Sequence, residues 1–227
     1  MSTSRTPAEE KFVDALEKGQ LDVVDLMLET GEARITMPID SYGMQPIHMA
    51  AGKGNVALIE LLVRHGADVN AKDNDSETPL MTAARWDEPE ALKKLIDLGA
   101  AFDTRDKGGM TALFGAAMNN KMKVVEILTD AGADPNVATD SGLTALFAAA
   151  LRGHFNVAKH LVDCGARLEQ KGHGLGITEF AEMISRSGGD KKMVADFLST
   201  TKLGKEAVEG TAEKVTAMKP LTFRKPS

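Results

Sequence analysis

The residues of this chain that could act in catalysis or bind a metal are few and scattered. It has five histidines and one cysteine. We expect neither His160 nor His173 to belong to a zinc site, because no set of Cys and His partners stands at ligand spacing. His65 falls where a helix is expected to end, and a cation there suits the helix dipole. Cys164 has only Arg167 as a basic neighbour at short range, which predicts an unreactive thiol.

The glycine-rich segment GHGLG, residues 172–176, superficially resembles a phosphate-binding loop. Such loops follow a strand and open a helix, whereas this segment follows no predicted strand. We interpret it as a turn. Because the chain offers no acid–base pair, activated nucleophile or metal set, we predict no catalytic residue, no cofactor, no metal and no small-molecule substrate.

A repeat of 33 residues is the element that positions the remaining candidate residues. Glycines that each precede alanine recur at this step, as do alanine pairs and a Gln or Thr that opens a short apolar run. The glycines are Gly66, Gly99, Gly132 and Gly165, and the pairs are Ala50-Ala51, Ala83-Ala84, Ala116-Ala117 and Ala149-Ala150.

Each period predicts two short helices. Pro46 and Pro79 suit a first helical turn, since the missing N–H is not needed there. The alanine pair lets two helices approach closely, and glycines such as Gly54 and Gly153 break the chain before a second stripe at helical spacing. Gly66 and its equivalents end the second helix, and a polar, turn-rich segment then leads to the next period.

On these residues the units resemble ankyrin repeats. The stretch YGMQPIHMAAGKGNVALIELLVRHGADVN, residues 42–70, matches that pattern over nearly its whole length. The resemblance implies an all-α ankyrin-repeat solenoid of stacked helix-turn-helix units with β-hairpin loops, about six repeats including end caps. It also assigns structural hydrogen bonds, and no catalytic role, to His48 and His154.

The predicted boundaries follow from the period and from its altered ends. They are an N-terminal arm (1–7), the repeat domain (8–200) and a basic C-terminal tail (201–227). Within the domain we expect a cap (8–40), four repeats (41–73, 74–106, 107–139, 140–173) and a C-terminal cap (174–200). From Lys202 onward the tail carries a charge of +3, which leaves −9 for the rest. Docking on the array, binding of a partner and plain disorder of the tail all remain open.

By the same resemblance, partners bind to hairpin tips and to the exposed face of each first helix, which line a concave groove. Trp86 and Tyr42, the only Trp and Tyr of the chain, would be anchors, and Arg85 and Arg152 would select charge. The alternative is that some of these side chains pack between adjacent hairpins. The predicted partner-binding residues are Tyr42, Met44, Lys53, Asp75, Glu77, Arg85, Trp86, Met110, Met118, Leu143, Leu151 and Arg152, with Met110, Met118 and Leu143 as adaptable contacts.

Asn70 and Asn136 each follow an acidic residue by two positions and a leucine by eight. In animal ankyrin repeats this pattern resembles the site of an asparaginyl hydroxylase. The interpretation we prefer is that each asparagine organises its hairpin, and modification of either remains an open hypothesis.

Composition limits the partners that we expect. Aromatic residues make up only 4% of the chain, so its core must be built from Ala, Leu, Val and Met, which favours close-packed helices. The net charge of −6 argues against nucleic acid. A single cysteine, a polar N-terminal segment and the lack of a long apolar run favour a soluble protein of the cytoplasm, with cytoskeletal or nuclear location as alternatives, and no membrane contact.

These observations predict a non-catalytic protein-binding module, an adaptor or scaffold that is monomeric by itself. Two alternatives come from other classes. In the first alternative the chain is a structural subunit of a cytoskeletal or ciliary assembly. In the second it is a regulatory or inhibitory subunit of an enzyme. The partner itself is not encoded in a repeat pattern, because ankyrin arrays share a scaffold and differ in the surface that it carries.

Overall fold

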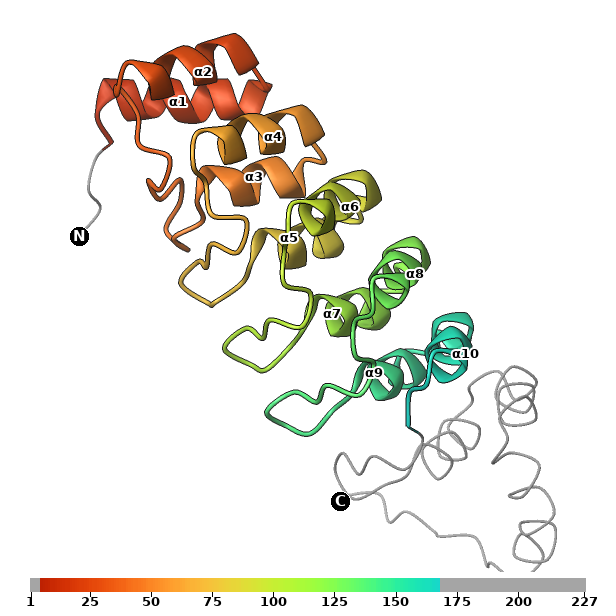
Figure 1. Cartoon of the computed structure of the whole chain (residues 1–227). Helices are drawn as coiled ribbons and strands as arrows, with labels where there is room; N and C mark the ends of the chain where they lie inside the picture. Colours follow the sequence, from red (N-terminus) through yellow and green to blue (C-terminus); the bar gives the residue numbers. More distant parts are fainter. Residues whose placement is uncertain (1–4, 168–227) are drawn as a thin grey trace, which may run out of the picture.

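The computed structural model describes residues 5–167, and in that range the chain forms ten helices and no strand. Consecutive helices are paired through short turns (Figure 1). The pairs are α1 (Pro7–Lys18) with α2 (Leu21–Glu29), α3 (Pro46–Gly52) with α4 (Val56–Arg64), α5 (Pro79–Trp86) with α6 (Pro89–Asp97), α7 (Ala112–Met118) with α8 (Met122–Asp130), and α9 (Ala145–Leu151) with α10 (Phe155–Asp163).

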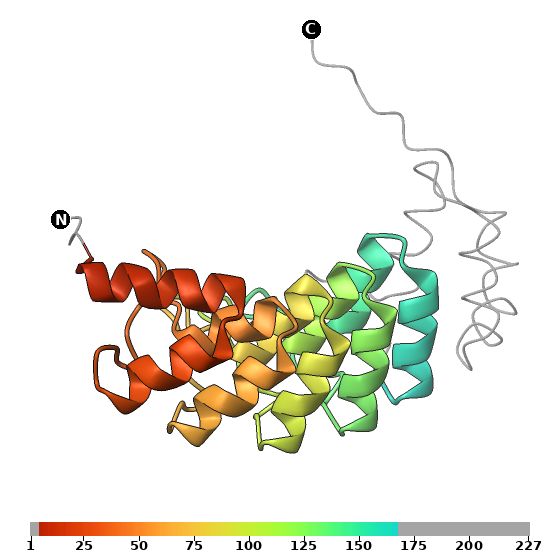
Figure 2. The same ribbon diagram turned by 90° about the horizontal axis from the view of Figure 1, so that it is seen from above.

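The pairs stack in chain order into a curved, two-layered array (Figures 1 and 2). We call the first helix of each pair inner and the second outer. Inner helices contact the inner helices of neighbouring units, and outer helices contact outer ones. The loop that leads from each outer helix to the next inner helix projects from the same side of the array (Figure 1). The all-helical repeat architecture is therefore confirmed.

Threonine caps begin three of the inner helices. The side-chain oxygens of Thr78, Thr111 and Thr144 accept hydrogen bonds from the backbone N–H three residues later, at 3.4, 3.2 and 3.4 Å. Each bond satisfies one of the N–H groups that a helix leaves unpaired at its start. A fourth threonine, Thr6, caps α1, where Thr6 and Glu9 bond each other's backbone N–H reciprocally. Helix α1 begins at Pro7, inside the segment predicted as the N-terminal arm.

The alanine pairs lie at the centre of the core. All eight of these alanines, in α3, α5, α7 and α9, are at most 1% exposed. A methyl group is the largest side chain that lets the inner and outer helix of a unit pack this closely. The core then runs as one continuous cluster through all five described pairs.

The glycines that end the outer helices are needed for their backbone conformation. Gly66, Gly99, Gly132 and Gly165 have φ angles of 87°, 91°, 96° and 91°. A side chain at these positions would be strained, because L residues rarely adopt positive φ. The repeat of glycine at 33-residue steps is thus the sequence trace of one recurring turn.

The loops are tight, hairpin-like turns rather than β-hairpins with strands. In each, a closing backbone hydrogen bond surrounds a narrower one, such as Ser76 N to Asp73 O at 3.1 Å. The closing bonds are Ile39 N to Met44 O at 2.7 Å, Asp73 N to Glu77 O at 3.1 Å, Asp106 N to Met110 O at 3.0 Å and Thr139 N to Leu143 O at 2.8 Å. The first loop closes one position further out than the other three.

Neighbouring loop tips are bonded to one another. The backbone N–H groups of Asn74, Lys107 and Asp140 donate to the carbonyls of Tyr42, Asp75 and Gly108, at 2.8, 2.9 and 3.1 Å. The tips therefore form one connected edge whose geometry depends on the stacking of the units.

Each predicted unit of the domain contains one helix pair as far as residue 167. Repeats 41–73, 74–106, 107–139 and 140–173 contain α3 to α10 in order. The predicted C-terminal cap (174–200), the tail (201–227), His173 and the segment 172–176 lie outside the described residues.

Asparagine side chains connect one unit to the next at the ends of two outer helices. The Asn70 amide accepts from Ala101 N at 2.8 Å and donates to Gly99 O at 3.5 Å. The Asn136 amide makes the same two bonds, from Arg167 N at 2.7 Å and to Gly165 O at 3.2 Å. An amide serves both partners because it carries an acceptor and a donor.

Asp103 holds the equivalent position in the unit that lies between those of Asn70 and Asn136. Its carboxylate accepts from Asp134 N at 3.2 Å, but an ionised carboxylate has nothing to donate to a carbonyl. Burial raises the pKa of Asp103 above its ordinary value, and the negative charge of Asp134 acts in the same direction. The unit of α5 and α6 is therefore joined to the unit of α7 and α8 by one hydrogen bond of the Asp103 side chain, where the side chains of Asn70 and Asn136 each make two.

Replacing this carboxylate with an amide tests the link. We expect Asp103→Asn to raise the free energy of unfolding at pH 7 by about 1 kcal/mol, the usual net value of one added hydrogen bond. Because the pKa of Asp103 is raised in the folded state, the penalty acts above that pKa and disappears in acid, where the protonated carboxyl can itself donate. The advantage of the variant should thus shrink as the pH falls toward 4. Urea unfolding measures it.

The reverse change is the control for this prediction. Asn70→Asp should lower stability at pH 7 by a similar amount, since it removes the donor from an intact pair. A stabilised Asn70→Asp variant, or an Asp103→Asn variant of unchanged stability, would contradict the account.

Candidate interaction surface

Two of the predicted anchor residues are widely exposed. Tyr42, at the first described loop tip, is 64% exposed, and Trp86, the last residue of α5, is 65% exposed. Leu151, at the end of α9, is 51% exposed. All three belong to the loops and inner helices, so the structure leaves large apolar side chains uncovered along this face.

Trp86 also touches the neighbouring unit. A side-chain carbon built on Gly52 of α3 would lie 3.1 Å from Cδ1 of the Trp86 ring. One edge of the indole thus rests on a glycine of the preceding inner helix. Part of the ring therefore packs within the chain, while the rest is exposed, and its role as a partner anchor stays a prediction.

Met44 and Leu143 are half-buried and pack against the core. They hold equivalent positions in the first and last described loops, where the backbone of each is also bonded within its own turn. Most of each side chain is therefore packed within the chain, in line with the alternative that the sequence left open. Only part of each remains available at the surface.

Four of the predicted residues surround one small hollow between α5 and α7, which we call the notch. Glu77 and Arg85 lie on the α5 side, and Met110 and Met118 on the α7 side. Its volume is about 90 Å³, well below the roughly 300 Å³ at which pockets for small ligands begin. The other lining residues, which the sequence did not single out for this role, are Met81, Asp106, Thr111, Ala112, Gly115 and Asn119.

The charges beside the notch are partly paired. Arg85 forms an ion pair with Glu77, whose side chain is 18% exposed while that of Arg85 is 53% exposed. Lys53 and Arg152, the residues that follow α3 and α9, are exposed and form no ion pair with a described residue. The helix ends of this face are therefore cationic on a chain whose net charge is −6.

The loop tips supply the opposite rim. Asp75 is exposed at its tip, where its N–H donates to the Asp73 carboxylate at 2.8 Å. Asp140 is exposed as well and pairs with Arg105 at 2.6 Å. The tips thus carry exposed carboxylates together with the exposed Lys107, while cations lie at the ends of α3, α5 and α9.

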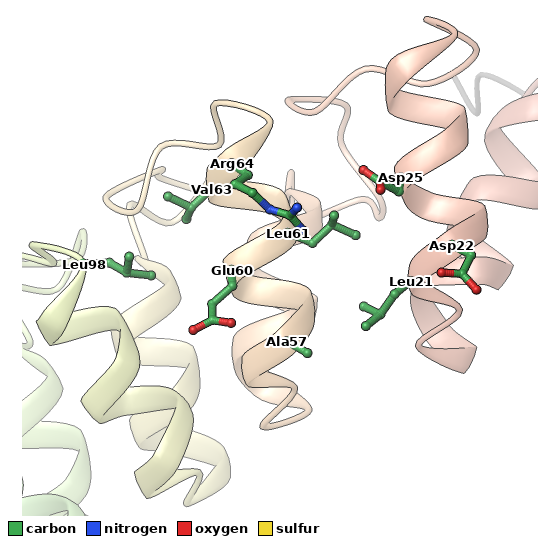
Figure 3. Close-up of a pocket in the computed structure, with 9 residues that line it drawn as sticks. All are labelled: Leu21, Asp22, Asp25, Ala57, Glu60, Leu61, Val63, Arg64 and Leu98. Atoms are coloured by element: carbon green, nitrogen blue, oxygen red, sulfur yellow. The ribbon is translucent and has the colours of Figure 1, made fainter.

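Crevices on the other side of the array separate successive outer helices. Figure 3 shows the one between α2 and α4, of about 620 Å³, which Asp22, Asp25 and Glu60 border. Asp25 lies 2.6 Å from the His65 ring and Glu60 lies 2.7 Å from Lys94, so both carboxylates already serve as links between units. A second crevice of about 640 Å³ separates α6 from α8. The crevices recur with the helix spacing, which indicates that they result from stacking.

Three of the four histidines in the described region are structural partners: His48, His65 and His160. His154, at the start of α10, makes no side-chain hydrogen bond with a described residue, so the structural bond expected of it is not found. The buried ring of His48 accepts from Gln45 N through Nδ1 at 3.1 Å and donates to Glu77 O of the next unit through Nε2 at 3.1 Å. His160 Nε2 lies 2.9 Å from the Thr129 hydroxyl and 3.5 Å from Cys164 Sγ. Arg167 is therefore not the only basic side chain near Cys164, contrary to the expectation from the sequence.

Residues 5–167 contain no group of three His, Cys, Asp or Glu side chains that could hold a metal ion. No helix in the same part of the chain is long and apolar enough to cross a membrane. The arrangement that remains is a rigid face with exposed aromatic, apolar and cationic side chains.

Comparisons with known proteins agree with the repeat architecture. A family model described as ankyrin repeats, in three copies, matches residues 12–106 and 87–172. Protein phosphatase 1 regulatory subunit 12A of Mus musculus is 45% identical over 51 residues, which cover 22% of this chain and 5% of that protein. The ankyrin repeat-containing protein P1E11.10 of Schizosaccharomyces pombe is 37% identical over 71 residues, covering 31% and 33%.

Human protein phosphatase 1 regulatory subunit 27 is 33% identical over 79 residues, covering 35% of this chain and 51% of that protein. The chain spans about half, or less, of the length of these relatives.

The pH dependence of stability tests the role of His48. Burial lowers the pKa of His48 below its ordinary value of 6.5. The unfolded chain therefore takes up a proton near that pH while the folded chain does not, and stability should fall as the pH drops through about 6.5, until the lower folded pKa is reached. Urea unfolding between pH 7.5 and 5 measures this loss.

The variant His48→Gln separates this residue from the other four histidines. It should be less stable at pH 7.5, since the ring's two bonds are altered, and should lose less stability between pH 7.5 and 5. An equal loss in both proteins would show that another group causes the pH dependence.

Proposed function

This chain belongs to the ankyrin-repeat family, and from that premise we propose that it is a non-catalytic protein-binding module, an adaptor or scaffold, which holds its partner on the loops and inner helices. The family implies interaction with other proteins. The observation that supports this particular face is the exposure of Trp86, at 65%, which follows Arg85, a residue that lines the notch. Tryptophan and arginine dominate the energetics of protein interfaces, and Arg85 precedes Trp86 on the same helix.

The proposed mechanism is rigid presentation. The loop tips are bonded to one another and each inner helix is packed between its neighbours. A surface held in this way loses little conformational entropy when a partner docks, so more of the contact energy remains for affinity. The half-buried methionines, Met110 and Met118, add side chains that adapt to the shape of what binds.

A second candidate is a regulatory subunit of an enzyme. Two of the relatives are named as regulatory subunits of protein phosphatase 1. Added to the catalytic subunit of protein phosphatase 1, the full chain should change its activity toward a phosphorylated protein if this candidate is right. Unchanged activity, together with no complex on a sizing column, would contradict it.

Truncation of the tryptophan tests the binding face. We expect Trp86→Ala to lower recovery of the partner at least tenfold when the full chain is the bait in affinity purification, because an exposed anchor is lost. Thermal unfolding should shift by no more than about 4 °C, as about 1 kcal/mol would produce. Recovery is quantified by mass spectrometry, and unfolding by circular dichroism.

Leu26→Ala is the matched control, since Leu26 is 58% exposed on the outer helix α2, away from this face. It should leave recovery unchanged. If Trp86→Ala keeps its partner, or if it loses stability in proportion to binding, the residue packs the array and the proposed face is wrong.

A further inference from the structure

A glycine inside a helix lies at the notch. Gly115 is the fourth residue of α7 (Ala112–Met118), where glycine is less favourable than any residue but proline. The equivalent residues in α3, α5 and α9, at 33-residue steps, are Met49, Thr82 and Ala148. Among these four inner helices only α7 lacks a side chain at this place.

Packing within the chain does not require this glycine. A side-chain carbon built on Gly115 meets no atom within 4 Å. Gly52 of α3 is the contrasting case, because a carbon built there would come within 3.1 Å of both Thr82 and Trp86. Gly52 is thus explained by a neighbouring unit, whereas Gly115 faces open space. A costly glycine in front of open space is expected where another molecule approaches the backbone.

We propose that the notch receives one aliphatic side chain from an acidic segment of the partner protein. This inference rests on the proposed function and names the chemistry of the segment that the face recognises. The two parts of the claim, the aliphatic side chain and the neighbouring carboxylates, come from different observations.

The aliphatic part follows from the walls and the size of the notch. Methionines line it from both units, Met81 from α5 and Met110 and Met118 from the α7 unit. Met81 is 8% exposed and forms a fixed wall, while Met110 and Met118 are half-buried and can adjust. A volume of about 90 Å³ equals roughly three water molecules at about 30 Å³ each. One aliphatic side chain fills such a space, and a cofactor does not.

The acidic part follows from the charges at the helix ends. Arg85 borders the notch and keeps half of its side chain exposed beside its ion pair with Glu77. Asp106, the other carboxylate of the lining, already accepts hydrogen bonds from the backbone N–H groups of Gly108 and Met110 in its own loop. A guanidinium has five N–H donors, so one carboxylate leaves others free. In this cationic row, Lys53 lies one unit before Arg85 and Arg152 lies two units after it, and neither has a described ion-pair partner. A segment with carboxylates next to its apolar residue complements the row.

The chain's own C-terminal tail fits the row less well. From Lys202 onward it has six basic and three acidic residues, so its charge has the same sign as that of the helix ends. The tail is therefore the competing occupant, and the experiment below separates it from a partner by the charge of the peptides that are recovered.

Selection of peptides on the full chain tests the proposal. The probe is a phage-displayed library of random twelve-residue peptides. We expect recovered sequences to share one Leu, Ile, Val or Met next to Asp or Glu. A recovered peptide, synthesised with a fluorescent label, should bind Gly115→Leu and Arg85→Glu at least tenfold more weakly than the original chain in fluorescence anisotropy. Lys123→Glu, an exposed charge reversal on α8, should bind as the original does.

Gly115→Ala gives a second, opposite readout. Alanine is the better helix residue and finds free space here, so the melting temperature should rise by about 2–4 °C. The same methyl group narrows the notch and should weaken peptide binding about two- to fivefold. A variant that is more stable and binds less well cannot be explained by damage to the fold.

The possible results separate this inference from the proposed function. Recovery of basic peptides, or binding that Gly115→Leu leaves unchanged, overturns the inference. If Trp86→Ala weakens the binding of the recovered peptides while Gly115→Leu does not, the proposed binding face stands and the role proposed for the notch is wrong. Recovery of no peptide above background also counts against the notch.

Discussion

Burial of each helix pair against the next is the interaction on which this structure depends. A single pair of seven- to twelve-residue helices is too thin to cover its own apolar surface. The alanine pairs let the layers close up, and the core becomes continuous only when units are stacked. The bonds between loop tips and the amide links between units, from Asn70 and Asn136, then repeat with the stack. The contacts of a residue therefore depend more on its position within a unit than on its position along the chain.

Because the contacts between units recur at fixed positions, the other positions of each unit are free to vary. The capping threonines, the alanine pairs and the turn glycines recur because each unit must meet the next in the same way. Between them, at the positions of Met49, Thr82, Gly115 and Ala148, the residue changes from unit to unit. Exposed aromatic and cationic side chains gather on the same face. The scaffold therefore determines where binding chemistry can be placed, and the variable residues determine which chemistry it is.

Regular features were predictable from the sequence because they are local. The cap of Thr6 and Glu9 involves residues three apart, and the glycines at positive φ are needed by a single turn. Features that join units were harder to predict. The pairing of Arg85 with Glu77, the edge of Trp86 against Gly52 and the half-buried state of Met44 depend on the offset between neighbouring units. β-Hairpin loops were expected, and tight turns without strands were found in the described part of the chain.

By itself the sequence determined the family, the helix pairs, the apolar residue types of the core and the face that we propose for binding. Each of these follows from a spacing of 33 residues and from short-range backbone chemistry. Only the tertiary structure decided which side chains on that face are exposed, which are paired, and that a hollow opens beside Gly115. The reason is physical: a hollow is the space that two neighbouring helices leave unfilled, and its existence depends on how both of them are placed.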